Sequence, residues 1–385
     1  MPRLVHVLTV PESLLFLRGQ VRWMRERGYE IDVVTSPGDG IAEFESAEGV
    51  MVHALPMPRA ITPGRDLVTL ARLTALLRKL KPDLVHAHTP KGGLLGMLAA
   101  RGAGVRARIY HLRGLALATA TGPKRAILET TERTSCGVAT RIICNAHSLR
   151  AEALDLGLCP PEKIEVPLAG SGNGVDSANR FNPAKLEAGT RESVRKELGI
   201  PQGALVVGFV GRLVGDKGVV ELAQAWSVLR EERPDAHLLV VGRFEEKDEV
   251  PPTVRQDLEG DERVHLAGFV EGKDLARYYA ATDVVALPTY REGFPNVPLE
   301  AAAMKLPVVA TRVSGCVDAV EDGKTGLLVE AKDAGGLLEA LRTYAGNPGL
   351  RRAHGDAGRT RVTTLFVRER IWEEIERVYQ RELAA

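Results

Sequence analysis

The sequence lacks the features of a secreted or membrane-spanning protein. Its 385 residues include only four cysteines, with no Cys-x-x-Cys pair and no histidine at zinc-binding spacing. We therefore expect four free thiols in a reducing compartment, and no disulfide. No run reaches the roughly 18 apolar residues of a membrane-spanning helix, and the first residues do not resemble a signal peptide. These absences predict a cytoplasmic protein.

Two signatures of nucleotide binding are also absent. Pro11-Glu12-Ser13 follows the first predicted strand, where a Gly-x-Gly-x-x-Gly turn would stand, which disfavours dinucleotide-dependent dehydrogenase chemistry. Gly323-Lys324-Thr325 looks like the end of a P-loop, but Asp318 occupies the place of its first glycine, so we expect a turn between a helix and a strand. No Asp-x-Asp pair occurs. The sequence therefore offers no obvious carboxylate pair to hold a divalent metal on a nucleotide diphosphate.

The pattern that is present is that of a two-domain α/β protein. The chain is more than twice the length of an average domain of roughly 150 residues. Short β-branched runs alternate with longer helical segments, which is typical of βαβ units and parallel sheets. The predicted strands are 4–9, 31–35, 51–54, 84–87, 107–110, 141–144 and 164–166, followed by 205–210, 237–241, 264–266, 284–287, 308–311 and 326–329.

Composition suggests where the domains meet. Glycine, asparagine, serine and proline gather between positions 170 and 201, so we expect a Rossmann-like domain over 1–195 and a second over 196–365. The segment 366–385 is predicted to form a helix that packs on one of the domains, and a return to the N-terminal domain also fits. The apolar face of this helix consists of Val367, Ile371, Ile375 and Val378.

The charge is balanced overall but not between the halves. The net charge is +1, yet residues 1–195 hold 26 lysines and arginines against 19 aspartates and glutamates, a difference of +7. Residues 196–385 hold 25 against 31, a difference of −6. A basic half fits contact with anionic lipid, nucleic acid or a phosphorylated substrate, and it also fits an uneven scatter of solvated charge.

Two groups of residues in the C-terminal half suit a phosphate and a sugar. Arg212 and Lys217 stand among glycines after the strand 205–210, where they could neutralise a diphosphate leaving group without metal. Glu292 and Glu300 flank the start of a helix, whose free amides can bind phosphate while a carboxylate accepts hydrogen bonds from sugar hydroxyls. Taken singly, the cations also fit a solvated turn, and Glu300 also fits the preference of carboxylates for a first helical turn.

The two groups together form a specific pattern. The chain resembles the retaining nucleotide-sugar glycosyltransferases of family 4. The residues that carry the resemblance are Gly-Arg-Leu-x-x-x-Lys-Gly at 211–218 and Glu-Gly-Phe-Pro-x-x-x-x-Glu at 292–300. The resemblance covers essentially the whole chain. It implies the GT-B fold, an α/β arrangement of two doubly wound Rossmann-like domains facing a cleft, with the donor mainly on the second domain and the acceptor mainly on the first. It also implies transfer with retention of configuration and without a divalent metal or other cofactor.

The resemblance assigns roles by position. Arg212 and Lys217 would bind the donor diphosphate, and Glu292 would position and stabilise the transferred sugar. Glu300 would bind the ribose hydroxyls, and the backbone near Val270 would meet the base. The backbone expected to contact sugar and phosphate runs through Gly293, Phe294, Pro295, Asn296 and Val297.

The N-terminal half narrows the comparison. The segments 85–93 and 170–176 resemble a bacterial branch that builds capsule, O-antigen and lipid-linked oligosaccharides. This resemblance implies a nucleotide sugar, most simply a UDP-sugar, as donor and a polyprenyl-diphosphate-linked saccharide as acceptor. Such an acceptor lies on the cytoplasmic face of the membrane, which suits the basic half of the chain. We therefore expect peripheral contact with anionic membrane, and no contact with nucleic acid.

Two departures from the family pattern concern the same half. The chain has Pro11-Glu12-Ser13 where many relatives have a Gly-Gly loop, and Arg113-Gly114 where they have His-Gly. Because an arginine is a permanent cation, we expect Arg113 to hold acceptor or donor phosphate rather than act as a base. His88, Lys91 and His111 are the other acceptor or phosphate candidates, although a histidine at a strand end is commonly structural.

The predicted activity is transfer of a hexose or N-acetylhexosamine to a lipid-linked saccharide in surface polysaccharide or glycan biosynthesis. One alternative is the same chemistry on a small soluble acceptor. Another is a regulatory protein that binds a nucleotide sugar without turning it over. Sedimentation with anionic vesicles would favour the lipid-linked acceptor, and any product would exclude the regulatory protein.

Overall fold

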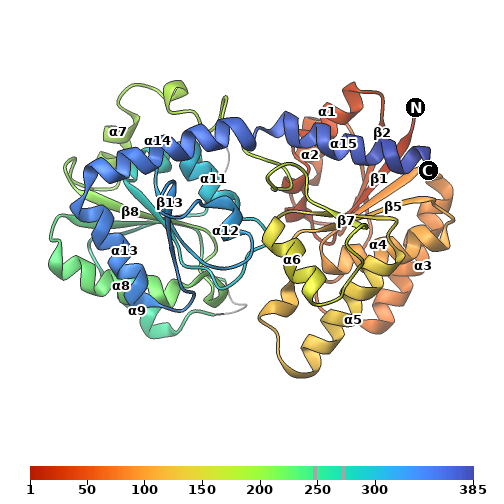
Figure 1. Cartoon of the computed structure of the whole chain (residues 1–385), viewed down its shortest axis with the longest axis horizontal. Coiled ribbons are helices and arrows are strands. Elements are labelled where there is room, and N and C mark those ends of the chain that lie inside the picture. Colours follow the sequence, from red (N-terminus) through yellow and green to blue (C-terminus); the bar gives the residue numbers. More distant parts are fainter. Residues whose placement is uncertain (246–248, 271–273) are drawn as a thin grey trace. The chain divides into compact units, whose positions relative to one another are not determined.

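The computed structural model describes residues 1–245, 249–270 and 274–385 (Figure 1). The chain forms two compact units, each with its own parallel sheet. The first unit consists of Met1–Asn173 together with Arg368–Ala385, and the second of Gly174–Val367. The chain therefore passes from the first unit to the second and returns at its end.

The first unit contains a seven-stranded parallel sheet with the order β3-β2-β1-β4-β5-β6-β7. The strands are β1 Arg3–Val7, β2 Glu30–Thr35, β3 Met51–Ala54, β4 Leu84–His88, β5 Ala107–Leu112, β6 Arg141–Cys144 and β7 Ile164–Glu165. The helices are η1 Pro11–Phe16, α1 Gln20–Glu26, α2 Ile41–Glu48, α3 Pro63–Leu80, α4 Pro90–Gly102, η2 Ala116–Ala118, α5 Gly122–Val138, α6 His147–Asp155 and α15 Arg368–Ala384.

The second unit contains a six-stranded parallel sheet with the order β10-β9-β8-β11-β12-β13. The strands are β8 Leu205–Val210, β9 Ala236–Val241, β10 Val264–Gly268, β11 Val284–Leu287, β12 Val308–Thr311 and β13 Gly326–Val329. The helices are η3 Pro183–Lys185, α7 Thr190–Glu197, η4 Gly215–Lys217, α8 Val219–Glu232, α9 Pro252–Gly260, α10 Asp274–Ala281, α11 Asn296–Ala303, α12 Cys316–Ala319, α13 Ala334–Gly346 and α14 Pro348–Leu365.

Both sheets are doubly wound, which confirms the predicted Rossmann-like domains. Each of the thirteen predicted runs overlaps an observed strand. The strand order reverses between β1 and β4 in the first unit and between β8 and β11 in the second. In open α/β sheets, ligands bind beyond the carboxyl ends of the strands at such a switch point. A ligand-binding site is therefore expected at the loops that follow these four strands.

The units divide earlier than the predicted boundary at residue 195. Residues 174–195, expected in the first domain, belong to the second unit. The cause is α7, which packs on α10 through a completely buried arginine. The guanidinium of Arg195 pairs with Asp283 at 2.9 Å and donates to the carbonyl of Ala281 at 3.1 Å. The composition indicated a joint between the domains in this segment, but it could not reveal the long-range ion pair.

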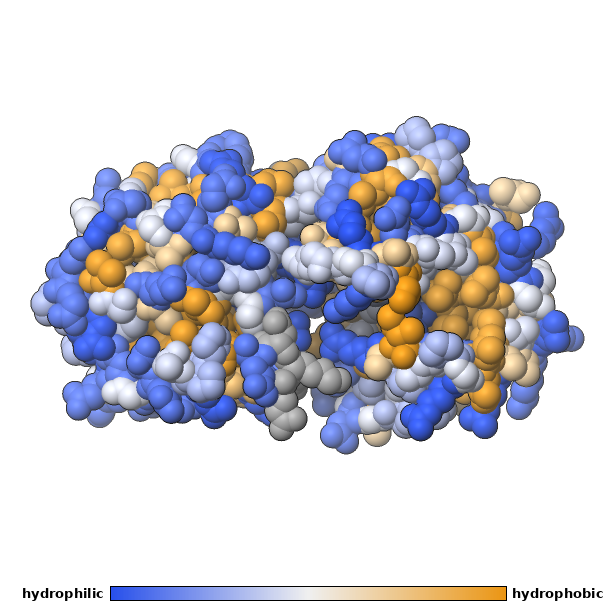
Figure 2. All heavy atoms as spheres, turned by 90° about the horizontal axis from the view of Figure 1, so that it is seen from below, coloured by the Kyte–Doolittle hydropathy of each residue, from blue (hydrophilic) through white to orange (hydrophobic). Residues whose placement is uncertain are grey.

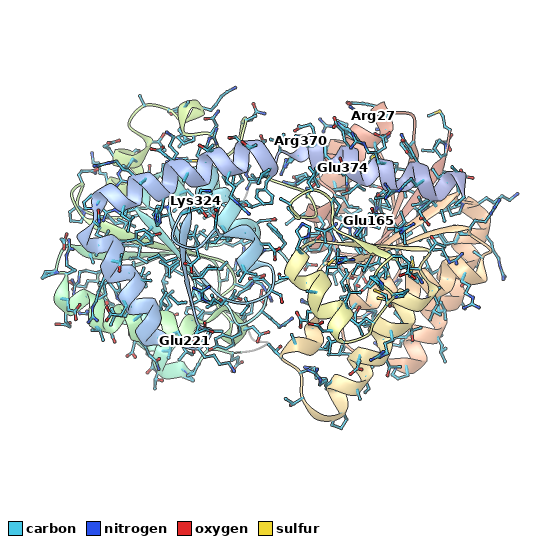
Figure 3. The ribbon with its side chains drawn as sticks, in the orientation of Figure 1. Arg27, Glu165, Glu221, Lys324, Arg370 and Glu374 are labelled. Carbon is cyan, nitrogen blue, oxygen red and sulfur yellow. The ribbon has the colours of Figure 1, made fainter. Side chains whose placement is uncertain are left out.

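The C-terminal helix α15 packs on the first unit. Trp372 Nε1 donates to Asn173 Oδ1 at 2.6 Å, and the hydroxyl of Tyr379 lies 2.6 Å from His86 Nδ1. Two ion pairs add to these contacts: Arg27 with Glu376 at 3.7 Å, and Glu165 with Arg381 at 2.6 Å. Figure 3 labels Arg27 and Glu165. The helix thus completes the core of the unit in which the chain begins.

The surface, the helices and the cysteines bear on the expectations about membranes and disulfides. Hydrophobic side chains gather on part of the first unit, which lies on the right in Figure 2, and hydrophilic ones surround them. Among the described residues, no helix combines the length and the apolar character needed to cross a bilayer. All four cysteines are free thiols, as predicted, and three of them are buried.

Candidate active site

The switch point of the second unit brings Lys217 and Glu292 together. Lys217 ends η4, just after β8, and Glu292 lies in the loop after β11, the strand next to β8 in the sheet. Lys217 Nζ forms an ion pair with Glu292 Oε1. The lysine and glutamate side chains are only 20% and 13% exposed, so neither charge is fully solvated. The structure therefore joins two residues that the sequence separates by 75 positions.

The backbone around this ion pair is closely packed. Gly218 has a φ of +69°, and a Cβ at this position would lie 1.9 Å from the carbonyl oxygen of Pro288. The carbonyl of Asp216 accepts hydrogen bonds from the amide of Tyr290 at 2.8 Å and from Thr289 Oγ1 at 3.0 Å. The loop after β8 is thus tied to the loop after β11, and Gly218 is required by the close approach.

Arg212 occupies a different position from Lys217. Its guanidinium pairs with Glu245 at 2.9 Å, and the two side chains are 47% and 39% exposed. A solvent-exposed ion pair of this kind contributes little free energy and is easily broken. The structure therefore does not place Arg212 in the Lys217–Glu292 pair, although both cations follow the same strand.

The predicted phosphate-binding backbone lies at the start of α11. Pro295 is the N-cap, and no described side chain caps this helix end. The side chain of Phe294 is buried, with its ring centroid 5.5 Å from that of Phe366. Gly315 approaches from the neighbouring loop, where a Cβ would lie 2.5 Å from the carbonyl oxygen of Gly293. Exposed amides at a helix N-terminus suit an anion.

Glu300 is oriented by a tyrosine that the sequence analysis missed. Tyr279 is fully buried on α10, and its hydroxyl donates to Glu300 Oε2 at 2.9 Å. Burial, together with the Glu300 carboxylate, raises the pKa of Tyr279 well above its usual value, so the phenol keeps its proton. No sequence signal distinguishes Tyr279 from its neighbour Tyr278.

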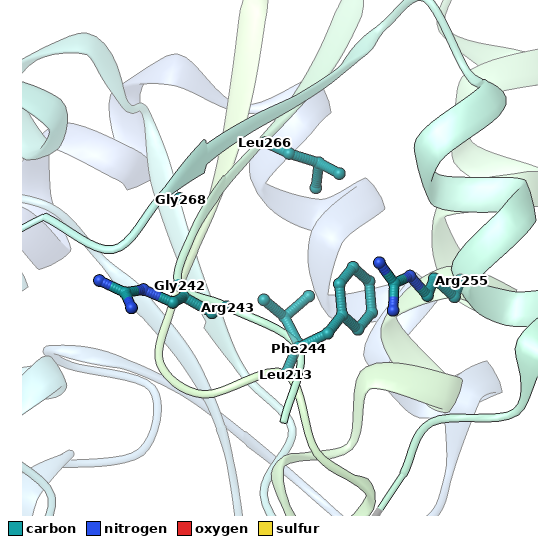
Figure 4. A pocket seen from close by; sticks show the side chains of 7 residues that line it. All are labelled: Leu213, Gly242, Arg243, Phe244, Arg255, Leu266 and Gly268. Atoms are coloured by element: carbon teal, nitrogen blue, oxygen red, sulfur yellow. The ribbon is translucent and has the colours of Figure 1, made fainter. Parts of the chain in front are cut away.

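A cavity of about 310 Å³ opens beyond the carboxyl ends of β8, β9 and β10 (Figure 4). A close backbone crossing helps to form it, because a Cβ on Gly242 would lie 1.7 Å from the carbonyl oxygen of Gly211. The predicted base contact at Val270 lies two residues beyond Gly268, which lines the cavity. The full lining is Leu213, Gly242, Arg243, Phe244, Arg255, Leu266 and Gly268. Its mixture of apolar and cationic side chains suits a flat polar ring.

In the first unit, four histidines form a buried cluster on β1, β4 and β5. His88 and His111, which the sequence suggested, lie there with His6 and His86, which it did not. Burial lowers the pKa values of His86, His88 and His111 well below the usual range. Burial and the nearby charge of Arg113 lower the pKa of His6 to about 3. All four imidazoles are therefore neutral at physiological pH.

Hydrogen bonding fixes the tautomers of the first pair of histidines. Arg113 Nε lies 3.2 Å from His88 Nδ1, and an arginine can only donate. His88 must therefore carry its proton on Nε2, which lies 3.0 Å from His6 Nδ1. His6 accepts this bond and carries its own proton on Nε2, a buried atom with no partner among the described residues.

The second pair of histidines forms a similar chain. His111 Nε2 lies 2.7 Å from Asn145 Oδ1, so it donates to the amide oxygen. Its Nδ1 then accepts from His86 Nε2 at 3.1 Å, and His86 Nδ1 accepts from the hydroxyl of Tyr379 at 2.6 Å. In this arrangement both nitrogens of His88 and of His111 are engaged, so neither offers a lone pair to a reacting group.

The cluster has the spacing of a metal site but not the lone pairs. The ligand atoms of His6, His86 and His88 all lie within 4.8 Å of one another. Each imidazole lone pair already accepts a hydrogen bond, and the guanidinium of Arg113 adds a positive charge beside them. A divalent cation would have to displace these bonds and approach a fixed cation, so the residues do not fit one.

Lys91 has a structural partner. Its Nζ lies 2.7 Å from Asp66 Oδ1 and also donates to the carbonyl of Ala60, which ties the start of α4 to the start of α3. The lysine and aspartate side chains are only 14% and 19% exposed. The charge of Lys91 is thus balanced by Asp66. Arg113, the other cation that the sequence suggested in this unit, has no carboxylate partner in the described structure.

Comparison with known proteins decides the family. Sequence profiles described as "Glycosyl transferase 4-like domain" and "Glycosyl transferases group 1" match residues 15–169 and 204–347. A "Capsular polysaccharide biosynthesis glycosyltransferase CapM" from Staphylococcus aureus is 33% identical over 98% of this chain and 96% of its own length. The chain belongs to the family 4 glycosyltransferases. Their GT-B fold consists of two Rossmann-like domains, as observed here.

Two further similarities concern a relative and a solved structure. An Escherichia coli "UDP-Gal:alpha-D-GlcNAc-diphosphoundecaprenol alpha-1,3-galactosyltransferase" is 30% identical over 74% of this chain and 71% of its own. A crystal structure of Anabaena HepE in complex with UDP and glucose superposes with a TM-score of 0.82 at 21% identity, covering 99% of this chain and 100% of that one. At that identity HepE supports the fold alone.

Proposed function

We propose that this glycosyltransferase transfers a hexose or N-acetylhexosamine from a UDP-sugar to a polyprenyl-diphosphate-linked saccharide, with retention of anomeric configuration. The observation that carries the proposal is the Lys217–Glu292 ion pair at the switch point of the second sheet. A cation suited to a leaving diphosphate and a carboxylate suited to sugar hydroxyls lie there in direct contact, beside the amides of α11.

In the proposed reaction each group of this site has one task. When the donor binds, Lys217 stabilises the negative charge that develops on the leaving diphosphate, and Glu292 accepts hydrogen bonds from the transferred sugar. The acceptor hydroxyl attacks from the face that the diphosphate leaves, while the leaving phosphate assists removal of the proton. Positioning and electrostatics supply the rate acceleration, and no covalent sugar–enzyme bond is required.

The rest of the nucleotide is proposed to bind along the same edge of the sheet. Glu300, oriented by Tyr279, accepts hydrogen bonds from the ribose hydroxyls. The cavity beside Gly268 takes the base, with the backbone near Val270 at its edge. Arg212 turns from Glu245 to the diphosphate, which requires only that an exposed ion pair breaks. UDP is favoured because the E. coli relative is named for a UDP-sugar.

Transfer is proposed to need no divalent metal. The sequence has no Asp-x-Asp pair, while the second unit offers Lys217, Arg212 and the amides of α11 for the diphosphate. These groups supply the charge stabilisation that a metal ion would otherwise provide.

The lipid-linked acceptor is supported by the two relatives and by the first unit. The names of the relatives specify capsule synthesis and a diphosphoundecaprenol acceptor. The first unit holds 26 lysines and arginines against 21 aspartates and glutamates, a difference of +5. Its apolar side chains Leu67, Val68 and Ile127 are 68%, 51% and 47% exposed on α3 and α5. Apolar and basic groups on one unit suit peripheral binding to an anionic membrane.

The experiment that tests the proposal combines transfer with product analysis. UDP-sugars are screened with a polyprenyl-diphosphate-linked N-acetylhexosamine in excess chelator, and the product is examined by proton NMR. We expect transfer in chelator and an anomeric coupling that matches the donor. An inverted product would contradict the retaining mechanism, and dependence on added manganese would contradict metal independence. Efficient transfer to a soluble acceptor, with no sedimentation on anionic vesicles, would favour a soluble substrate instead.

A further inference from the structure

The first unit contains a half-buried arginine, Arg113, that has no carboxylate partner among the described residues. Arg113 follows β5 at the carboxyl edge of the sheet, and its Nη2 is buried with no hydrogen-bond partner in the described part of the chain. The bond that its Nε makes goes to a neutral imidazole, that of His88. Burial lowers the pKa of Arg113 to about 9, and no described carboxylate offsets this effect. A buried charge is normally paired, because leaving it unpaired is costly.

The histidine cluster cannot provide the missing negative charge. Its members are neutral, and their lone pairs already accept hydrogen bonds. His6 presents a second buried donor without a partner, its Nε2–H. Arg113 and the histidines therefore have hydrogen-bond donors without partners, but no lone pair without a partner. Such a group can bind an anion but not a cation.

The surrounding backbone holds Arg113 in this place. A Cβ on Gly172 would lie 2.2 Å from Arg113 Nη1 and 2.7 Å from Asn145 Oδ1, so only glycine leaves room for the guanidinium. The guanidinium carbon also lies over the ring of Phe16, 4.6 Å from its centroid. Thr89, between β4 and α4, has a φ of +67°, a strained conformation of the kind found at ligand sites. The guanidinium is thus pre-positioned at the switch point of the first sheet.

We propose that Arg113 binds a phosphoryl group of the acceptor, and that His88 is a positioning residue that holds the guanidinium in place. The planar fork of an arginine matches phosphate oxygens, and a substrate phosphate would provide the counter-charge that the unit lacks. The inference rests on the proposed function, because it identifies this group as part of the polyprenyl-diphosphate linkage of the acceptor. The proposal also explains the arginine at a position where many relatives have a histidine: an arginine keeps its positive charge at neutral pH, whereas an imidazole loses its charge.

The test compares two acceptors that carry the same sugar. One is the polyprenyl-diphosphate-linked saccharide, and the other is the neutral alkyl glycoside. Arg113→Gln should lower kcat/KM with the diphosphate acceptor by about 10²-fold, largely through KM, and should change kcat/KM with the alkyl glycoside by less than about threefold. Arg113→Lys should recover part of the loss, since it keeps the charge but not the fork.

His88 is tested by a matched pair of variants. The amide oxygen of asparagine can occupy the place of Nδ1 and accept from Arg113 Nε, whereas leucine cannot. We therefore expect His88→Asn to keep most of the preference for the diphosphate acceptor and His88→Leu to lose it. Equal loss of preference in both variants, with unchanged unfolding midpoints, would contradict the positioning role.

Other outcomes would overturn the assignment of Arg113. An equal fall with both acceptors would mean that Arg113 does not recognise phosphate on the acceptor. A raised KM for the UDP-sugar, with an unchanged acceptor KM, would place the guanidinium on the donor. If the wild-type protein transfers to neither acceptor, the proposed function fails and the site is judged by phosphorus NMR titration with pyrophosphate. Arg113→Gln must then weaken pyrophosphate binding in a Lys217→Ala background, and unchanged binding would refute the site itself.

Discussion

Acid should destabilise this protein because the first unit buries four neutral histidines. An unfolded histidine has a pKa of about 6.5, whereas burial lowers the pKa of His6 to about 3 and those of His86, His88 and His111 well below the usual range. At pH 5.5 each unfolded histidine binds about 0.9 proton. The folded histidines stay neutral, because the hydrogen bonds of the cluster use one nitrogen of each ring as an acceptor. The four histidines therefore take up about 3.6 protons on unfolding at this pH.

One buried carboxyl acts in the opposite direction. Glu132 accepts a hydrogen bond from the hydroxyl of Tyr110 at 2.7 Å, and burial raises its pKa to about 7. At pH 5.5 it holds a proton in the folded protein and releases about 0.9 proton on unfolding. The net uptake from these five groups is about 2.7 protons, so the free energy of unfolding falls by about 3.7 kcal/mol for each unit of pH lost in this range.

The assay is a direct count of protons taken up when the full chain is unfolded in guanidinium chloride. Uptake at pH 5.5 should be at least about 2.7 protons, because three histidines of the second unit also have lowered pKa values and add to it. At pH 7.5 the same measurement should give less than about half a proton. Glu132→Gln should raise the uptake at pH 5.5 by about 0.9. An uptake below about two protons at pH 5.5 would mean that the cluster is charged in the folded protein, and the assigned tautomers would be wrong.

The remaining predictions concern the second unit. Lys217→Ala should lower kcat by about 10²-fold or more, because it removes a cation from the leaving group, whereas Lys324→Ala, on an exposed turn, should leave kcat unchanged. Arg212→Ala should lower kcat by a smaller factor than Lys217→Ala, and a larger fall would show that the exposed guanidinium dominates. Glu300→Gln should weaken binding of free UDP in calorimetry, and Tyr279→Phe should weaken it less, since it removes only the bond that orients the carboxylate. Unchanged UDP affinity in Glu300→Gln would exclude the ribose role.

The sequence predicted the parts of this protein that depend on local pattern. The strands follow from short β-branched runs, and the loops with Lys217 and Glu292 could be placed because each directly follows a predicted strand. Contacts between distant segments could not be predicted in this way. Tyr279 reaches Glu300 only through the packing of α10, and Arg195 reaches Asp283 across 88 positions.

The histidine cluster shows the same limit at the candidate acceptor site. His88 and His111 were noticed as separate strand-end residues, but their hydrogen bonding depends on strand register. His6 shares their face of the sheet because β1 pairs with β4, and Tyr379 reaches it from the end of the chain. No spacing in the sequence encodes that combination.

The return of α15 to the first unit has a consequence for biosynthesis. A ribosome makes residues 174–367 as one uninterrupted stretch, so the second unit has all its strands before the last helix exists. The first unit, although it is translated earlier, waits for Trp372 and Tyr379 to cover its core. Until α15 is made, the apolar side chains that it covers stay exposed in the nascent N-terminal half, and exposed apolar surface favours aggregation. The usual N-to-C order of domain completion is thus reversed.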